Sequence, residues 1–262
     1  MARSPTSQDA KNFHELLSRT VDRLSRDLGL VVFRKQNGQH LILACLYSTI
    51  MQSSRECLLL MMQPTITLPS VLRSVVEAYA DLRAMIIDVD HGQRIIATFE
   101  KEKRRHLRSM INSTDNPYHL DVAQHIDPRI ELAKVDAELA RLTALGHRPM
   151  DNKSRFEWAG LVAEYESYYW LLCLEGHNSV TALEARHVIR KENGDYELIA
   201  TKDANSPEEI CRWCDALSRI LIDATMRLYG FLGIKRLGQC EEDLRQIELM
   251  VNELFGPSVE AA

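Results

Sequence analysis

Hydrophobic residues recur at intervals of three and four along most of the chain, the spacing that places them on one face of an α-helix. This pattern predicts a first helix over residues 9–28 and a second over residues 39–62. The second segment is apolar around much of its circumference, so we expect it to be the most buried helix. A third helix is predicted at residues 68–86. A fourth is predicted at residues 92–111, with Phe99 among its inward-facing side chains.

The second half of the chain carries clear signals for the starts of helices. Asp127 is a capping residue, and Pro128 after it suits the first helical position. Ser206 and Pro207 repeat this signal, followed by acidic residues in the first turn. The other elements predicted from spacing are a polar loop at residues 112–126, a helix at residues 155–175 and a last helix at residues 241–255.

One stretch between the helices has a different pattern. Residues 184–201 contain two runs rich in β-forming residues around Asn193 and Gly194, the preferred pair for a tight hairpin turn. We therefore predict an all-α fold, a multi-helix bundle of about seven or eight helices with one inserted β-hairpin. The predicted organisation is a disordered tail at residues 1–8, a single helical domain at residues 9–256 and a C-terminal tail at residues 257–262.

The composition of the 262 residues is that of an ordinary globular protein, with 45% hydrophobic and 26% charged residues. A formal net charge of -5 makes duplex nucleic acid an unfavourable partner for the surface as a whole. The most lipid-like run, LILACLYSTIM at residues 41–51, is too short to span a bilayer. The first residues, MARSPTSQDAKNF, lack the apolar core of a signal peptide. We expect a soluble, cytoplasmic protein with no membrane partner.

Arg73 and Glu77 stand one turn apart in the predicted third helix, at the margin of its apolar stripe and beside Ala80 and Ala84. Such a pair is commonly exposed and stabilises a helix by about 0.2–0.5 kcal/mol. Two features favour partners elsewhere. Arg before Glu is the weaker order within a helix, and the first helical turn disfavours a cation. We expect both side chains to meet polar groups of a second helix.

A second polar row is predicted in the helix that begins near residue 155. Tyr169, Cys173 and His177 are spaced four residues apart, so they form one row about 12 Å long. Gly176 marks the predicted helix end and places His177 at the terminus. The row indicates either the wall of a polar pocket, with His177 as a base or a ligand, or a histidine that caps a helix or packs in the core.

Together the two rows resemble a pair of motifs in a bacterial family of all-helical proteins that is classified as a domain of unknown function. In that family an Arg-Ser-x-x-Glu helix precedes a Tyr-x-x-Leu-Ser-x-x-x-His segment. This chain has LRSVVEAY and, later, YYWLLCLEGHNS. The resemblance covers residues 68–183 and matches Arg73, Ser74, Glu77, Tyr169, Leu172, His177 and Ser179. Cys173 stands where the family has serine. The resemblance implies no established reaction, but a helical architecture and a ligand site at Arg73, Glu77, Tyr169, His177 and Ser179.

Spacings of cysteine and histidine that suggest metal sites are incomplete. Cys211 and Cys214 have the C-x-x-C spacing, but a structural zinc site needs a second Cys or His pair. Asp88 and His91 fit one carboxylate–histidine helix of a di-iron protein, which needs two. The six cysteines follow no disulfide framework, as in reduced cytosolic proteins. We expect no metal and no cofactor, and a packing role for Cys211 and Cys214.

One segment is strongly basic. The run KEKRRHLR starts at Lys101 and ends at Arg108, on a helix whose other face is apolar. Such a run is commonly a solvated helix face, and it is also where this chain offers contacts to phosphate or RNA. No Phe, Tyr or Trp is interleaved with the basic residues, so bases would have nothing to stack on. Nucleic acid is predicted as a partner only through this segment.

These observations lead to three interpretations. The first is a ligand-binding or protein-interaction module of a bacterial stress or defence system, in which Arg73, Glu77, Tyr169 and His177 line a pocket for a small or phosphate-bearing ligand. The alternative is a metal-independent, ribonuclease-like enzyme, with His177 as acid and base, Arg73 on the phosphate and Glu77 as a further catalytic candidate. In the third, these groups bond only one another as a structural network. We also expect a homodimer through the hairpin or the last helix, because an isolated hairpin is marginally stable.

Overall fold

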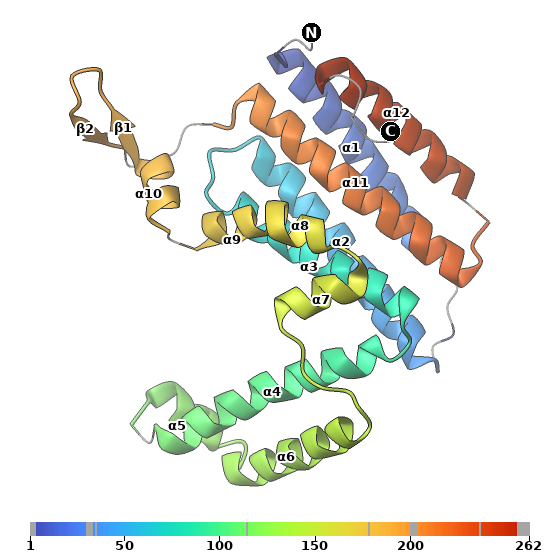
Figure 1. Ribbon diagram of the computed structural model, residues 1–262, viewed down its shortest axis with the longest axis vertical. Helices are drawn as coiled ribbons and strands as arrows, with labels where there is room; N and C mark the ends of the chain where they lie inside the picture. The colour runs from blue at the N-terminus through green and yellow to red at the C-terminus, as the bar shows by residue number, and fades with distance from the viewer. Residues whose placement is uncertain are drawn as a thin grey trace.

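Five long helices form the main body of the protein. They are α1 (Ser7–Leu28), α2 (Gly38–Met61), α3 (Leu68–Ile87), α11 (Pro207–Leu232) and α12 (Leu237–Phe255), and they pack side by side in Figure 1. The computed structural model describes residues 4–29, 34, 36–113, 115–177, 179–199, 204–235 and 237–255. Over these residues the fold is all-α with a two-stranded antiparallel hairpin, as predicted. It has more helices than the seven or eight expected, because a short helix lies in the predicted polar loop and a glycine divides one predicted helix.

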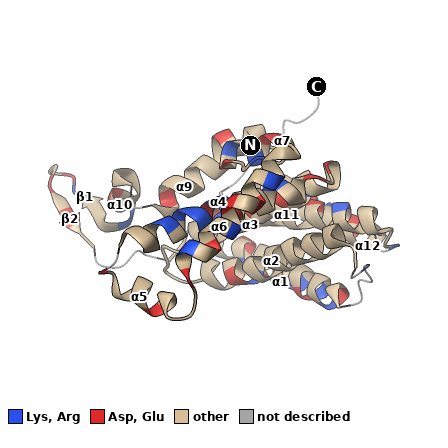
Figure 2. Ribbon diagram, turned by 90° about the horizontal axis from the view of Figure 1, so that it is seen from below, with Lys and Arg blue, Asp and Glu red and all other residues tan. Residues whose placement is uncertain are grey.

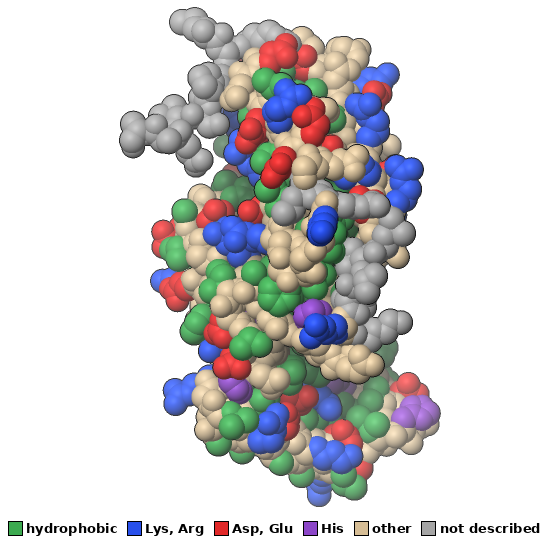
Figure 3. Space-filling view, turned by 90° about the vertical axis from the view of Figure 1, so that its right-hand side faces the viewer, with side chains coloured by type: hydrophobic (Ala, Val, Ile, Leu, Met, Phe, Trp, Pro, Cys, Tyr) green, Lys and Arg blue, Asp and Glu red, His purple; other side chains and the backbone are tan. Residues whose placement is uncertain are grey.

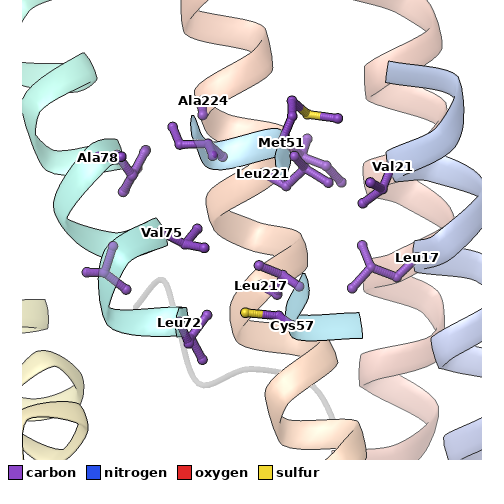
Figure 4. Packing of buried hydrophobic residues seen from close by; sticks show 14 of the residues in the cluster. Leu17, Val21, Met51, Cys57, Leu72, Val75, Ala78, Leu217, Leu221 and Ala224 are labelled. Carbon is purple, nitrogen blue, oxygen red and sulfur yellow. The ribbon is translucent and has the colours of Figure 1, made fainter. Parts of the chain in front are cut away.

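Helix α11 is the centre of the main hydrophobic core, because it contacts α1, α2, α3 and α12. Leu217 and Leu221 of α11 are fully buried, and Figure 4 shows them between Leu17 of α1 and Val75 of α3. Fully burying a leucine side chain contributes roughly 1.5–3 kcal/mol. The apolar stripes read from the sequence therefore account for the packing of the main body.

A second pair of helices has a small core of its own. α4 (His91–Asn112) and α6 (Pro128–Ala144) pack together beyond the main body and are linked through the short α5 (Pro117–Ala123). α5 lies in the segment predicted to be a polar loop, where Asn116 caps it. Phe99 of α4 is 63% exposed, so its predicted inward position was wrong. It was wrong because α4 runs past the main core. The core shared by α4 and α6 consists of Leu107, Met110 and Val135.

A glycine breaks the single helix predicted after residue 155. α7 (Asn152–Ala159) ends at Gly160, whose φ of 68° is the left-handed conformation common at helix ends. α8 (Val162–Glu164), the π-helical turn η1 (Tyr165–Tyr169) and α9 (Trp170–Gly176) then follow as one continuous segment. π-helical turns are rare and are frequent at functional sites.

Helix α3 is more buried than α2, contrary to the expectation. Twelve of the 20 residues of α3 are buried, against nine of the 24 residues of α2. α2, α7, α9 and α11 enclose α3, whereas Leu41 and Leu59 of α2 are 47% and 73% exposed. Apolar content was misleading here because it does not show how many neighbours a helix has. No helix in the described ranges combines the length and the apolar composition needed to cross a bilayer.

An arm projects from the main body after α9. It consists of α10 (Val180–His187) and a hairpin of β1 (Val188–Arg190) and β2 (Tyr196–Leu198), and Figure 1 shows it extending away from the helices. The predicted hairpin is confirmed, but it is shorter than residues 184–201. Its first predicted residues belong to α10, and residues 200 and 201 lie outside the described residues.

Capping groups confirm the predicted helix starts. Backbone N–H groups at the start of α6 donate to Asp127, and Ser206 opens α11 with a capping box. Thr6 forms a similar box, so α1 already begins at Ser7 and the N-terminal tail is shorter than residues 1–8. Residues 1–3 and the predicted C-terminal tail, residues 257–262, lie outside the described residues.

Two glycines provide a matched test of the helix break. Gly160→Ala should lower the free energy of unfolding by about 1–2 kcal/mol, because its backbone is left-handed. A Cβ there would meet nothing closer than Arg83 Nη2 at 3.9 Å, so only the backbone opposes it. Gly230 lies inside α11, and a methyl group added there would have open space around it. Gly230→Ala should therefore raise the free energy of unfolding by about 0.4–1 kcal/mol. Urea unfolding measures the free energy of unfolding of both variants. If both substitutions changed it in the same direction, the left-handed helix end at Gly160 would be contradicted.

Candidate functional site

Helix α3 carries a row of charged side chains along one side of an otherwise apolar helix. Arg73, Glu77 and Asp81 follow one another at intervals of four residues, so they lie on one stripe. Ala80 and Ala84 nearby are fully buried, which lets other elements approach the helix closely. Helices α7 and α9 pack against α3 and bring further polar groups to the stripe.

Glu77 is the centre of the first group of contacts. Its Oε1 atom accepts a hydrogen bond of 2.6 Å from the hydroxyl of Tyr169, and Asn152 Nδ2 donates to that hydroxyl at 2.8 Å. Arg73 Nε lies 3.5 Å from Glu77 Oε1, and Arg155 Nη1 lies 3.7 Å from Oε2. Arg73 and Glu77 therefore belong to a larger cluster and are not an isolated surface pair.

Asp81 is the centre of the second group. Its Oδ1 atom lies 3.1 Å from Arg155 Nε and 3.1 Å from His91 Nε2. Asp81 is 7% exposed, and His91 is fully buried at the start of α4. Two carboxylates on adjacent turns repel each other. Arg155 contacts both Glu77 and Asp81 and so balances this repulsion.

Arg73 and His177 form the outer end of the network. Arg73 Nη1 lies 3.3 Å from His177 Nε2. Because a guanidinium only donates, His177 Nε2 is the acceptor in this contact. α3 and α9 meet closely here because Gly176 has no side chain. A Cβ at that position would lie 3.1 Å from Ser70 Oγ.

The hydroxyl of Tyr169 is held in its neutral form. Burial raises the pKa of Tyr169 above its ordinary value of 10, and the neighbouring carboxylate of Glu77 raises it further. The rings of Phe156 and Tyr165 lie 4.6 and 5.5 Å from the Tyr169 ring, measured between centroids. Tyr169 is therefore a fixed hydrogen-bond donor to Glu77.

Two residues of the matched motifs have other roles. Ser179 caps α10, where its Oγ accepts from the N–H of Ala182 and donates to the carbonyl of Leu174. Ser74 is exposed and donates to the backbone carbonyl of Ser70. The structure thus brings together Arg73, Glu77, Tyr169 and His177, and it places both serines outside this group.

Sequence reasoning missed four members of the network, which are Asp81, His91, Asn152 and Arg155. Asp81 continues the four-residue spacing of Arg73 and Glu77 by one turn, a signal that was available. His91 fits an Asp-x-x-His spacing, which points to metal ligands and not to a buried partner for a carboxylate. Asn152 and Arg155 reach α3 only because the chain breaks at Gly160, and their spacing shows nothing of that break.

The geometry is that of an internal network that joins α3 to α4, α7 and the η1–α9 segment. Its centre is enclosed, with Tyr169 3% exposed, whereas Arg73 keeps 29% of its side chain exposed. Hydrogen bonds and ion pairs in a buried network restrict the relative position of the elements that they join. At the outer end, Arg73 Nη1 contacts His177 Nε2, so this ring nitrogen already has a partner within the chain.

The basic segment at residues 101–108 is partly neutralised by α6. Lys103 lies 3.7 Å from Glu131, and Arg104 lies 2.6 Å from Asp136. Figure 2 shows positive and negative residues side by side where α4 and α6 pack. This arrangement favours the interpretation of the segment as a solvated helix face.

Cys211 and Cys214 are fully buried, which confirms their packing role. Cys214 Sγ lies 3.7 Å from Met61 Sδ. Burial raises the pKa of the Cys211 thiol to about 11, so the thiol is protonated at neutral pH. Among the described residues, no three His, Cys, Asp or Glu side chains are placed together as metal ligands.

No protein-family model matches the chain, and neither a curated protein nor a solved structure matches it. The resemblance to the bacterial helical family therefore stays an expectation that rests on the quoted residues. The contacts of α3 with the Tyr169 and His177 region are independent of that resemblance, because they come from the structure alone.

The network predicts a measurable coupling between two of its members. Tyr169→Phe should lower the free energy of unfolding by about 1–3 kcal/mol, because Glu77 loses its hydrogen-bond donor. With Glu77→Ala as the second change, which removes the acceptor, a double-mutant cycle should give a coupling energy of about 0.5–3 kcal/mol. Tyr165→Phe is the control, since the Tyr165 hydroxyl has no partner among the described residues. It should cost less than about 0.5 kcal/mol. A coupling energy near zero would mean that the contact does not stabilise the fold.

The raised pKa of Tyr169 predicts a pH dependence of stability. The unfolded chain loses this proton first as the pH rises, so the contribution of the hydroxyl is complete below pH 10 and declines above it. The difference in unfolding free energy between wild type and Tyr169→Phe should therefore shrink by about 1.4 kcal/mol per pH unit above pH 10. Guanidinium unfolding between about pH 8 and pH 11 measures this difference. A constant difference over that range would contradict the prediction.

Proposed function

We propose that the protein is a protein-interaction module that assembles as a homodimer through its arm. The proposal rests on the exposure of large apolar side chains on both parts of the arm. Val180 of α10 is 72% exposed, and Tyr196 and Leu198 of β2 are 69% and 80% exposed. Apolar side chains that gather on one exposed element commonly mark an interaction surface.

The face of the molecule away from the arm has a different character. Figure 3 shows this face, on which hydrophobic side chains lie in small groups separated by polar and charged ones. Scattered exposure of this kind is normal for globular proteins. The arm differs because its hairpin packs mainly on α10 and has little cover from the main body.

The arm is held in place by contacts at its base. Arg186 is 5% exposed and donates to the backbone carbonyl of Glu175 near the end of α9. This bond satisfies one of the free acceptors at a helix C-terminus. His187 Nδ1 lies 3.2 Å from the carbonyl oxygen of Ile199, which ties the hairpin to α10. A surface fixed before binding loses less conformational freedom when it meets a partner.

The composition of the hairpin favours a second copy as the partner. Val188 pairs with Leu198 across the two strands, and Lys191 and Glu197 form an ion pair of 3.0 Å. A two-fold interface must be self-complementary, and a surface that has apolar groups and both signs of charge is compatible with this requirement. The outer edges of a two-stranded sheet also offer unpaired backbone groups to another strand.

The bacterial stress or defence setting of the first interpretation belongs to the same proposal. A ligand site or a ribonuclease site at Arg73 and His177 has less support, because these two side chains bond each other. The exposed arm therefore supports an interaction role more strongly than the charged network supports a chemical one.

Gel filtration with light scattering tests the homodimer. Wild type should have about twice the 30.0 kDa mass of the chain. Tyr196→Ser combined with Leu198→Ser should give a monomer, because the central apolar groups of an interface carry most of its binding energy. Both side chains are exposed within one chain, so the variant should retain the circular dichroism spectrum of wild type.

Leu249→Ser is the matched variant for the other element expected at the dimer contact. Leu249 is 57% exposed on α12. If this variant becomes monomeric while the arm variant stays dimeric, the interface lies on α12. A wild-type monomer at micromolar concentration would contradict the homodimer altogether.

A further inference from the structure

The turn of the hairpin determines which residues of β1 and β2 direct their backbone groups towards each other. Gly194, with a φ of 88°, donates its N–H to the carbonyl of Lys191, and the N–H of Lys191 donates to the carbonyl of Asp195. This is a three-residue loop with a glycine bulge, a common hairpin connection. At the other end of the hairpin, the N–H of Ile199 donates to the carbonyl of His187. Counted from these two pairs, every second residue bonds across the hairpin.

The backbone groups of the intervening residues point away from the hairpin. Bonded and non-bonded positions alternate along an antiparallel pair of strands. Val188 and Arg190 therefore direct their backbone groups to the outer edge of β1, and Tyr196 and Leu198 direct theirs to the outer edge of β2. Each outer edge is a row of donors and acceptors that a further strand can extend.

The two outer edges differ in what already lies against them. β1 packs against α10, and the N–H of Val188 donates to the carbonyl of Glu184 in α10. All three residues of β2 are exposed, and Figure 1 shows the hairpin clear of the long helices of the main body. The outer edge of β2 is therefore the one that a second strand can approach.

The side chains along β2 divide between the two faces of the hairpin. Tyr196 and Leu198 share one face with Val188, because alternate residues of a strand point the same way and Val188 is directly opposite Leu198. Glu197 lies on the other face, where Lys191 is its ion-pair partner at 3.0 Å. This edge thus carries two exposed apolar side chains and one charge that is balanced within the chain.

We propose that β2 pairs antiparallel with β2 of a second copy, so that two hairpins form one four-stranded sheet. The inference rests on the homodimer proposed above and specifies its contact. A two-fold axis at Glu197 places Tyr196 opposite Leu198 of the second copy, and Leu198 opposite its Tyr196. Because these residues direct their backbone groups outward, each of the two pairs exchanges N–H···O bonds in both directions.

Charge and pairing select this register. An axis at Tyr196 would place Asp195 opposite Glu197 of the second copy on both sides of the axis. An axis at Leu198 would separate each Tyr196 from Leu198 of the other copy. The axis at Glu197 gives one like-charge pair against two aromatic–aliphatic pairs of comparable strength. Lys191 also lies beside each Glu197, so the attractive contacts outweigh the repulsion.

Cysteine cross-linking of the full chain tests the pairing. Glu197 and its copy would form a non-hydrogen-bonded pair with Cα atoms about 4.5 Å apart, a separation that a disulfide spans. Ile189→Cys is the matched control, because Ile189 is exposed and directly opposite Glu197 within the hairpin. Three strand spacings, roughly 14 Å, would separate it from its copy. Under mild oxidation, Glu197→Cys should give at least about tenfold more disulfide-linked dimer than Ile189→Cys.

Both variants are made in a Cys45→Ser chain, since Cys45 is exposed, and that chain alone gives the background from the other native cysteines. Light scattering before oxidation separates this inference from the homodimer itself. A dimer in which Glu197→Cys links no more than Ile189→Cys would overturn the β2 pairing and leave the homodimer standing. A dimer in which Leu198→Cys links more than Glu197→Cys would overturn the register. A monomer would overturn the homodimer and this inference with it.

Discussion

The fold depends on how α3 accommodates charges within the most enclosed part of the molecule. Glu77 and Asp81 lie on adjacent turns, and Asp81 is nearly buried. Each carboxylate needs a cation or a donor, because a buried charge without a partner is strongly destabilising. Arg155 of α7 forms an ion pair with both Glu77 and Asp81. Tyr169, which follows the Gly160 break in the chain, donates a hydrogen bond to Glu77. The break therefore serves the network, since one straight helix would separate Arg155 and Tyr169 by about 21 Å, too far for both to reach Glu77.

This network also determines where the exposed features lie. By fixing Tyr169, the network fixes η1. It thereby also fixes the position of Tyr168, which lines a cleft between α3, η1 and α11. By closing α9 onto α3 at Gly176 it sets the point from which the arm leaves the main body. The network therefore acts as a support for two surfaces, and this explains why a cluster of charged residues can matter without meeting a ligand itself.

The sequence predicted the parts of the structure that depend on local rules. Hydrophobic spacing located the long helices, and capping residues such as Asp127 and Ser206 located their starts. The unusual placement of Arg73 and Glu77 correctly indicated partners on the Tyr169 segment. Sequence spacing missed what depends on tertiary contacts. Arg155 reaches α3 through a left-handed glycine, and the greater burial of α3 follows from its neighbours. Likewise, the acids that neutralise α4 come from α6.

The cleft lined by Tyr168 borders η1 and the arm follows α9, so Tyr169 lies between them along the chain. A ligand shifts a distant surface only if the element between them has two arrangements with different affinities. Here Tyr169 stands between Tyr168 and the base of the arm, and a short hydrogen bond to Glu77 and two packed rings hold it. The bond between Tyr169 and Glu77 therefore anchors to α3 the segment that lies between η1 and the arm.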